Sequence, residues 1–232
     1  MAVSVNRSDM RTGARRLADV EAFTDRFPDA ELNDYVNRGL GSYHQILVQA
    51  NGEKYKASYT DISVTSGTTL YNLPATFFKI FDVHATINGH NEWFLPYTHD
   101  ERASLLDTAG GHGSYPYCYG LIGSQIEFLP TPGAAITVRL WYVPDTAQLT
   151  DDVTAFDSLN RLGDEYVMAY AAQLCALKDA KWERYNALGN KLAMIEKQIR
   201  ATVPNRDRNA PPMIVDVRGG HWMSRVAQWR SR

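Results

Sequence analysis

The sequence predicts an α+β fold, in which N- and C-terminal helices pack as a bundle with a central antiparallel β domain and an extended C-terminal arm. Apolar residues recur at helical spacing within residues 8–51 and 158–203. Between them, residues 55–150 alternate apolar with polar side chains and are rich in β-branched and aromatic residues. We therefore expect one domain over residues 1–203 with an inserted β block, followed by an arm over residues 204–232.

The first helical region is expected to hold two helices. Residues 8–23 form the first, with Leu17, Val20 and Phe23 on its apolar side. The second is expected to begin with Asp29 as its N-cap.

The second helix has apolar positions at helical spacing from Leu32 to Leu47. Gly39 and Gly41 interrupt this pattern. They indicate either a weaker helix or a close contact with another helix.

The most regular strand pattern lies between Ile126 and Pro144. Apolar and polar residues alternate on both sides of a linker, Pro130-Thr-Pro-Gly133, which is the period of a half-buried strand. The prolines cannot donate ladder hydrogen bonds and the glycine permits a sharp reversal. We therefore expect these two strands to pair as a β-hairpin.

Further strands are expected at residues 59–64, 70–73, 77–87, 93–95 and 115–122. Asn88-Gly89 is a strong hairpin signal. Thr98-His-Asp-Glu101 matches a capping box, which predicts a short helix through Leu106.

The second helical region also predicts two helices. Asp157 or Ser158 can cap the first, and Pro204 ends the second. The expected apolar stripe of the first consists of Leu159, Leu162, Tyr166, Tyr170, Leu174 and Leu177. The expected face of the second runs from Trp182 to Ile199.

Charge, cysteine content and hydropathy argue against three classes: a protein that binds nucleic acid with its whole surface, a disulfide-bonded protein and a membrane-spanning protein. The formal net charge of −2 argues against nucleic-acid binding by the whole surface, although six arginines against two aspartates make residues 204–232 basic. Cys118 and Cys175 have no CxxC spacing and fit free thiols in a reducing compartment. No segment approaches the roughly 20 apolar residues of a membrane span.

No motif specifies a reaction, so the sequence predicts no catalytic, cofactor-binding or metal-binding residues and no enzyme activity. None of the six histidines forms an HExxH motif. Cys118 with His112 could supply a thiol nucleophile and its base, but burial among aromatic residues is the better interpretation of Cys118. The glycine-rich segment 110–113 lacks the Lys-Ser/Thr of a phosphate-binding loop.

Arginines at the N-terminus could contact DNA. Arg11, Arg15 and Arg16 lie on one side of the first expected helix, where they could touch phosphates without reading sequence. The alternative is a solvated helix face.

An ordered series of segments between Asp29 and Val203 resembles the tailed-bacteriophage head-to-tail connector family, also called portal adaptors. The segments are Asp29-Ala-Glu-Leu-Asn-Asp-Tyr-Val-Asn37, Ser66-Gly-Thr-Thr-Leu-Tyr-Asn-Leu-Pro74, Phe77-Phe-Lys-Ile80, Asn88-Gly89, Trp93-Phe-Leu-Pro96, Tyr115-Pro-Tyr117, Ile126-Glu-Phe-Leu-Pro-Thr-Pro132, Leu140-Trp-Tyr-Val-Pro144, Leu149-Thr-Asp151 and the alanine-rich run 166–176. The arm is not covered by this resemblance.

The resemblance implies a structural protein of the virion neck, assembled in the host bacterial cytoplasm. It implies a ring of twelve copies beneath the portal protein, extending the DNA channel and providing the platform for tail or neck proteins. Genomic DNA would pass through without sequence-specific binding, and no catalysis, cofactor or membrane is implied.

The arm is expected to bury its apolar residues on a partner, by strand addition or by docking a helix in a groove. The expected contacts are Met213, Ile214, Val215, Val217, Arg218, Trp222, Arg225, Val226 and Trp229. Two alternatives stay open: a phage-encoded hydrolase acting at Cys118 or a histidine, and a carbohydrate-binding tail module. The second would use the aromatic residues Trp93, Tyr97, Tyr115, Tyr117 and Tyr119.

Overall fold

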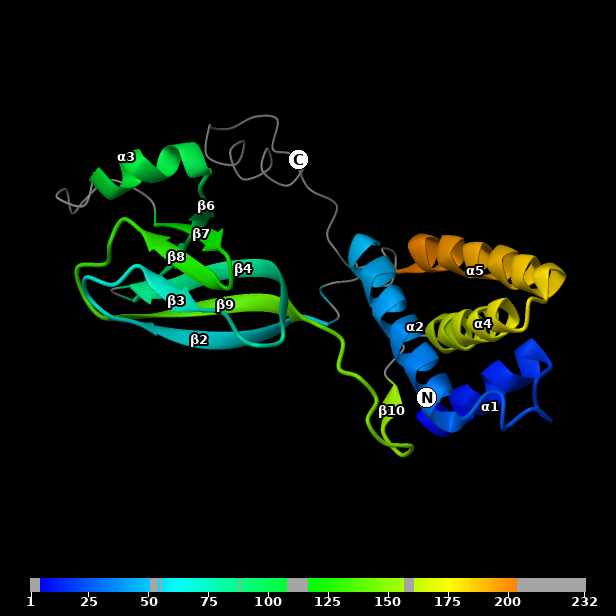
Figure 1. The fold of residues 1–232 in the computed structure, drawn as a ribbon. Helices are drawn as coiled ribbons and strands as arrows, with labels where there is room; N and C mark the ends of the chain where they lie inside the picture. The colour runs from blue at the N-terminus through cyan, green and yellow to red at the C-terminus, as the bar shows by residue number, and fades with distance from the viewer. Residues whose placement is uncertain are drawn as a thin grey trace.

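The chain builds a helical part and a β part (Figure 1). A computed structural model describes residues 5–50, 54, 56–87, 89–107, 117–156 and 161–203. The helical part contains α1 (Arg7–Ala18), α2 (Asp29–Gln49), α4 (Arg161–Lys178) and α5 (Trp182–Thr202). The β part is inserted between α2 and α4, so the predicted α+β class is confirmed. The expected arm, residues 204–232, lies outside the described residues.

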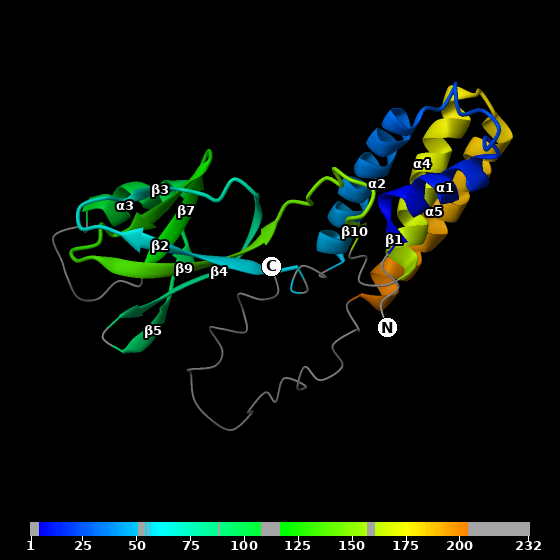
Figure 2. The ribbon, with the colours of Figure 1, turned by 90° about the horizontal axis from the view of Figure 1, so that it is seen from below.

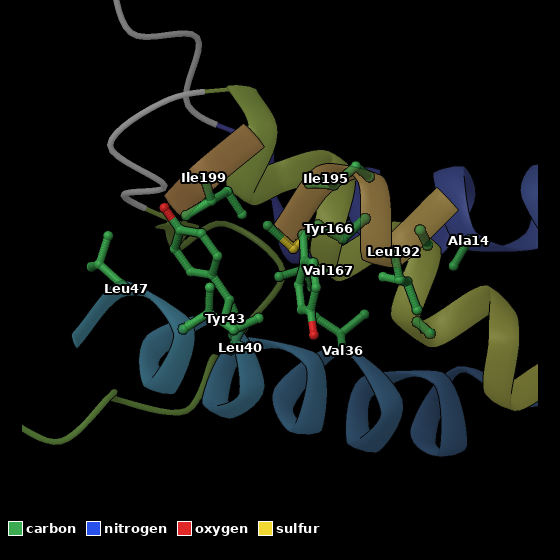
Figure 3. Close-up of a cluster of buried hydrophobic side chains, with 14 of the residues drawn as sticks. Ala14, Val36, Leu40, Tyr43, Leu47, Tyr166, Val167, Leu192, Ile195 and Ile199 are labelled. Carbon is green, nitrogen blue, oxygen red and sulfur yellow. The ribbon is translucent and has the colours of Figure 1, made fainter. Parts of the chain in front are cut away.

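The helices pack around α4, which contacts α1, α2 and α5. Side chains from four helices meet in one core, among them Ala14 of α1, Leu40 of α2, Val167 of α4 and Ile195 of α5 (Figure 3). Gly39 lets α2 approach α4 closely, because a Cβ added there would lie 3.3 Å from side-chain atoms of both Val167 and Tyr170. The close helix contact suggested by this glycine is confirmed.

The buried surface of α4 consists largely of small residues. Ala169, Ala171, Ala172, Cys175 and Ala176 are all fully buried. Because α4 contacts neighbours on several sides, small side chains around its circumference suit it better than a single stripe of large ones. The expected stripe is accordingly wrong at its end, where the side chain of Leu177 is 43% exposed.

Both N-terminal helix boundaries differ from expectation. Helix α1 ends at Ala18 because Asp19 takes a left-handed conformation with φ of 56°. Phe23 therefore lies outside the helix and is 53% exposed, whereas Val20 is buried. At the next helix Pro28 takes the N-cap position and Asp29 is the first helical residue.

The β part consists of two four-stranded sheets whose inner faces share one core. The first sheet has the order β2 (Ser58–Val64), β9 (Ile136–Pro144), β4 (Phe77–Ile87), β5 (His90–Trp93). The second has the order β3 (Leu70–Asn72), β8 (Gln125–Leu129), β7 (Cys118–Ile122), β6 (Leu95–Pro96). All pairs are antiparallel except β6 with β7.

In this region one expected pairing is wrong, although its two strands form, and one expected strand is divided. Strands β8 and β9 are not a hairpin: β8 pairs with β3 and β7, while β9 lies between β2 and β4 in the other sheet. Their linker carries the chain across the core, so Phe128 and Leu140 meet from opposite sheets. Likewise the expected strand 93–95 is divided, because Trp93 ends β5 and Leu95 begins β6.

Local turn signals succeed where pairing predictions fail. Strands β4 and β5 form the expected hairpin, with Ile87 paired to His90 and Gly89 at φ of 81°. The capping box forms at Thr98, whose N–H donates to Glu101 Oε2 at 2.8 Å. A 3-10 turn (His99–Glu101) then leads into α3 (Arg102–Asp107). Asn88, the Tyr115-Pro116 start of the expected aromatic strand and the expected caps Asp157 and Ser158 lie outside the described residues.

The two glycines of α2 give a matched test of the α2–α4 contact. We expect Gly39→Leu to lower the free energy of unfolding by about 1–3 kcal/mol or more, because the larger side chain overpacks against Val167. A Cβ at Gly41 would meet no atom within 4 Å. Gly41→Leu should therefore be neutral or stabilise by up to about 1 kcal/mol through helix propensity. Urea unfolding of both variants checks this; equal losses would contradict the packing described.

Candidate interaction surfaces

The segment that returns the chain from β9 to α4 is tied to the N-terminal helices. Its strand β10 (Ala155–Phe156) pairs with β1 (Val5–Asn6) immediately before α1. Leu149 is held by its backbone: its N–H donates to Asn37 Oδ1 at 2.9 Å, and its carbonyl accepts from Arg7 at 2.8 Å. Residues 145–156 are thereby fixed against both α1 and α2.

Asp152 is the ionic centre of this attachment. Its carboxylate accepts a hydrogen bond from Arg7 Nε at 2.8 Å and two from the guanidinium of Arg11 at 2.7 and 2.8 Å. The hydrogen bonds from Arg11 and then Arg7 lower the pKa of Asp152 to about 2. We call Arg7, Arg11 and Asp152 the return clamp.

The three arginines predicted to contact DNA have different environments. Arg11 is buried and belongs to the return clamp. Arg15 donates to the carboxylate of Asp29 at 2.7 Å and to the carbonyl of Phe27 at 2.9 Å. The side chain of Arg16 is 71% exposed. Arg11 and Arg15 therefore stabilise the fold from within, and DNA contact stays a prediction best suited to Arg16.

A buried carboxylate that the sequence analysis missed lies in the second sheet. Glu127 of β8 is 1% exposed and accepts from both Nε and Nη2 of Arg102 at 2.7 Å, and from the hydroxyl of Tyr97. Gly120, its cross-strand neighbour, makes room for Tyr97, because a Cβ there would lie 2.3 Å from the phenol Cζ. Position 120 must therefore be glycine, because the side chain of Tyr97 packs directly over it.

The electrostatics of Glu127 are those of a structural ion pair. The Arg102 hydrogen bonds are the largest cause lowering the pKa of Glu127. Burial, followed by the bond to Glu127, raises the pKa of Tyr97 to about 12. With the carboxylate ionised and the phenol protonated near neutral pH, the group fastens α3 to the sheet.

The outer face of the first sheet carries exposed aromatic and charged residues from all four strands. The ring of Tyr59 lies 5.0 Å from that of Trp141, and the guanidinium of Arg139 lies 4.4 Å over Tyr59. Arg139 also makes two hydrogen bonds to the carboxylate of Asp61, at 2.8 and 2.9 Å. This cluster crosses β2 and β9.

The same face continues across β4 and β5. His84 is paired with Arg139 on one side and with Trp93 on the other, with the His84 and Trp93 rings 5.3 Å apart. Trp93 is 61% and Tyr59 52% exposed. Tryptophan, tyrosine and arginine gathered on one exposed surface are typical of protein interfaces. We call the surface formed by Tyr59, Asp61, His84, Trp93, Arg139 and Trp141 the sheet face.

The α1–α2 loop and the turn between α4 and α5 lie at the end of the helical part farthest from the sheets, and both carry exposed aromatic residues (Figures 1 and 2 show the segments). Phe23 of the α1–α2 loop is 53% exposed, Leu177 near the end of α4 is 43% exposed, and Trp182 at the start of α5 is 60% exposed. The α1–α2 loop is joined to that region by ion pairs: Arg26 with Asp179 at 2.9 Å and Arg184 with Asp19 at 3.1 Å. We call the surface formed by Phe23, Leu177 and Trp182 the helical tip.

The structure offers little support for a thiol hydrolase. Cys118 is buried, and its burial raises the pKa of the thiol, which disfavours the thiolate a nucleophile needs. Its candidate base, His112, lies outside the described residues. Among the described residues, no group of three or more His, Cys, Asp or Glu is placed to hold a metal ion. Nor does any helix in that part of the chain have the length and apolar character to cross a membrane.

The aromatic residues considered for carbohydrate binding do not form one platform. Trp93 is exposed on the sheet face, whereas Tyr97 bonds to Glu127 in the other sheet. Tyr117 stacks on Phe94 at 5.1 Å and Tyr119 packs against the core between the sheets. Tyr115 lies outside the described residues.

The Glu127 site predicts unequal effects of two small substitutions. Tyr97→Phe removes only the hydroxyl, and we expect a loss of about 1–3 kcal/mol in the free energy of unfolding because a buried carboxylate loses a donor. Gly120→Ala should cost at least as much, since the new Cβ displaces the whole ring. Chemical denaturation measures the free energy of unfolding of both variants. A Gly120→Ala variant as stable as wild type would contradict the packing of the Tyr97 ring over Gly120.

The return clamp predicts a pH-dependent contribution to stability. Because the folded-state pKa of Asp152 lies below its ordinary value, ionised Asp152 stabilises the fold above about pH 4, and this contribution is lost as pH falls through about 2. The melting temperature of wild type should exceed that of Asp152→Asn at pH 6, and the gap should close between pH 4 and 2. Asp25→Asn, in an exposed loop, is the control. A gap that does not change with pH would contradict the role of Asp152.

Comparison with known protein families shows what this chain is similar to. A family model described as SU10 adaptor protein matches residues 5–216. This match includes both parts of the fold and extends past α5, so the likeness does not end at Val203 as the segment series indicated. No curated protein matches the chain.

Proposed function

Because the chain belongs to the SU10 adaptor protein family, a family of phage adaptors, we propose that it is a structural head-to-tail adaptor of the virion. In this proposal twelve copies form a ring beneath the portal protein. The ring continues the DNA channel and provides the attachment platform for a tail or neck protein. The chain would act through its surfaces, without catalysis.

The observation that carries the proposal is the pair of exposed aromatic surfaces on two different parts of the molecule, the helical tip on the helical part and the sheet face on the outer side of the first sheet. An adaptor must bind one partner at each end, and exposed Trp, Tyr and Phe are the side chains that contribute most to such contacts. We assign the helical tip, with Phe23 and Trp182, to the portal side, where the helices can wedge between subunits. The sheet face, with Tyr59 and Trp93, then points toward the tail or neck protein.

The return clamp would strengthen the connection between the helical part and the β part under load. Force between head and tail must pass through the connection between the helical and β parts. Asp152, Arg7 and Arg11 fasten the returning segment to α1 within a few residues of where β10 pairs with β1. The clamp therefore resists separation of the two parts at the point where load would cross.

The proposal also includes a contact of the N-terminal arginines with DNA and a contact of the arm with a partner chain. Arg16 is 71% exposed and, within the described part of the chain, forms only a surface ion pair with Glu21 at 3.4 Å, so of the predicted three it is the arginine best placed to approach phosphates passing through the channel. The arm contacts predicted from sequence, Met213 to Trp229, are proposed to reach the portal or a neighbouring copy.

Light-scattering mass after size exclusion tests the two-ended arrangement with matched variants. Wild type mixed with its cognate portal ring should give a complex heavier by twelve chains. Phe23→Ser with Trp182→Ser should abolish portal binding, whereas Tyr59→Ser with Trp93→Ser should retain it, because only the first pair lies on the helical tip. All four side chains are exposed, so both double variants should fold, as circular dichroism can confirm. Loss of portal binding by the sheet-face variant alone would reverse the assignment.

Truncation tests the contribution of the arm. A chain ending at Pro204 retains every helix and strand described, so its melting temperature should stay close to that of the full chain. We expect this truncated protein to be a folded monomer that fails to join the portal. Normal docking of the truncated chain would remove the arm from the proposed interface.

A further inference from the structure

Strand β2 presents a long, unprotected edge. It lies at the margin of the first sheet and pairs with β9 alone among the described strands (Figure 1). Its sequence, Ser58-Tyr-Thr-Asp-Ile-Ser-Val64, contains no proline and no lysine, and its one charge, Asp61, is paired with Arg139. Alternate N–H and C=O groups along such an edge point outward and can pair with another strand.

The other edges of the two sheets are protected by their length. Strand β5 has four residues, β3 three and β6 two, and β6 includes Pro96. Short strands and proline are common devices against edge pairing. With seven residues, β2 is the longest of the described strands at a sheet margin and can accept an added strand of five.

The chain itself contains a segment suited to this edge. Met213-Ile-Val-Asp-Val217 is β-branched and free of proline and glycine, and it follows Pro211-Pro212. As a strand, it would place Met213, Val215 and Val217 on one side, matching the apolar inner side of β2 with Ile62 and Val64. The family match continues to residue 216 and so includes most of this segment.

Charge and reach favour the same pairing. Residues 58–144 hold three lysines or arginines against seven aspartates or glutamates, a net charge of −4, whereas residues 204–232 hold six arginines against two aspartates, a net charge of +4. Opposite net charge promotes the encounter. The nine residues between Val203 and Met213 can span about 33 Å when extended, which is enough to leave one copy and reach another.

We infer that Met213–Val217 of one copy adds a fifth strand to the edge of β2 in the neighbouring copy. This inference rests on the proposed ring. A contact of one copy's arm with the next copy's edge is heterologous, which is the kind of contact that closes a ring, whereas direct β2–β2 pairing would be isologous and stop at a dimer. Main-chain hydrogen bonds would link each subunit to the next.

Disulfide trapping between two differently tagged full-length proteins tests the inference. One protein carries Ser63→Cys on the exposed side of β2, and the other carries Ile214→Cys or Asp216→Cys. Native Cys118 and Cys175 are buried and should not interfere. After mixing on the cognate portal ring, we expect a cross-link between the two tags. Asn91→Cys on the opposite edge strand β5, paired with the same arm variants, is the matched control and should give none.

Each outcome decides a separate point. A portal complex of the right mass without any cross-link overturns the inference and leaves the adaptor proposal standing. If one chain that carries both Ser63→Cys and Ile214→Cys forms the cross-link within itself while the two separately tagged proteins form none, the arm folds onto its own β2, which also overturns the inference. Failure to form a portal complex counts against the adaptor proposal itself.

A pair of proline variants distinguishes an arm that pairs with β2 as a strand from an arm that only lies near β2. Val215→Pro removes a main-chain donor and breaks a strand without touching the folded part of the chain. It should abolish the cross-link, whereas Asn209→Pro, outside the pairing segment, should preserve it. Equal cross-linking by both proline variants would show that the arm lies near β2 without pairing to it.

Discussion

The attachment of the returning segment to α1 and α2 is the constraint on which the rest of the fold depends. The chain leaves the helical part after α2, builds two sheets and must return at a defined place before α4. Asp152 with Arg7 and Arg11, the β1–β10 pair, and the hydrogen bonds of Leu149 determine that place. Without them α1 would have one fewer partner, and the β part would be joined to the helices by two unanchored connections.

This constraint explains why charges near the N-terminus are less available than their sequence suggests. Arg11 and Arg15 look like a solvent-facing or DNA-facing basic stripe, because local spacing cannot reveal partners 141 and 14 residues away. Only the tertiary fold shows that Asp152 and Asp29 neutralise them. The chain uses long-range ion pairs to join distant segments, while aromatic residues stay exposed on the helical tip and the sheet face.

The parts of the fold that local chemistry determines could be predicted from sequence. Helices α2 and α5, strand β4, the Gly89 hairpin and the Thr98 capping box follow from periodicity and turn residues. Strand partners could not be predicted, since the alternation in β8 and β9 identifies buried faces but not which sheet each joins. Glu127 was missed for the same reason: its donors, Tyr97 and Arg102, come from other elements. The sheet face and the helical tip likewise require tertiary structure to become visible.

A reconstruction by electron cryo-microscopy of the chain bound to its cognate portal ring tests the two-ended adaptor most directly. The proposed function predicts a ring in which Phe23 and Trp182, both exposed, contact the portal while the sheet face, with Tyr59 and Trp93, points away from it. Density that places the sheets against the portal, or a portal ring without this chain, would contradict the account.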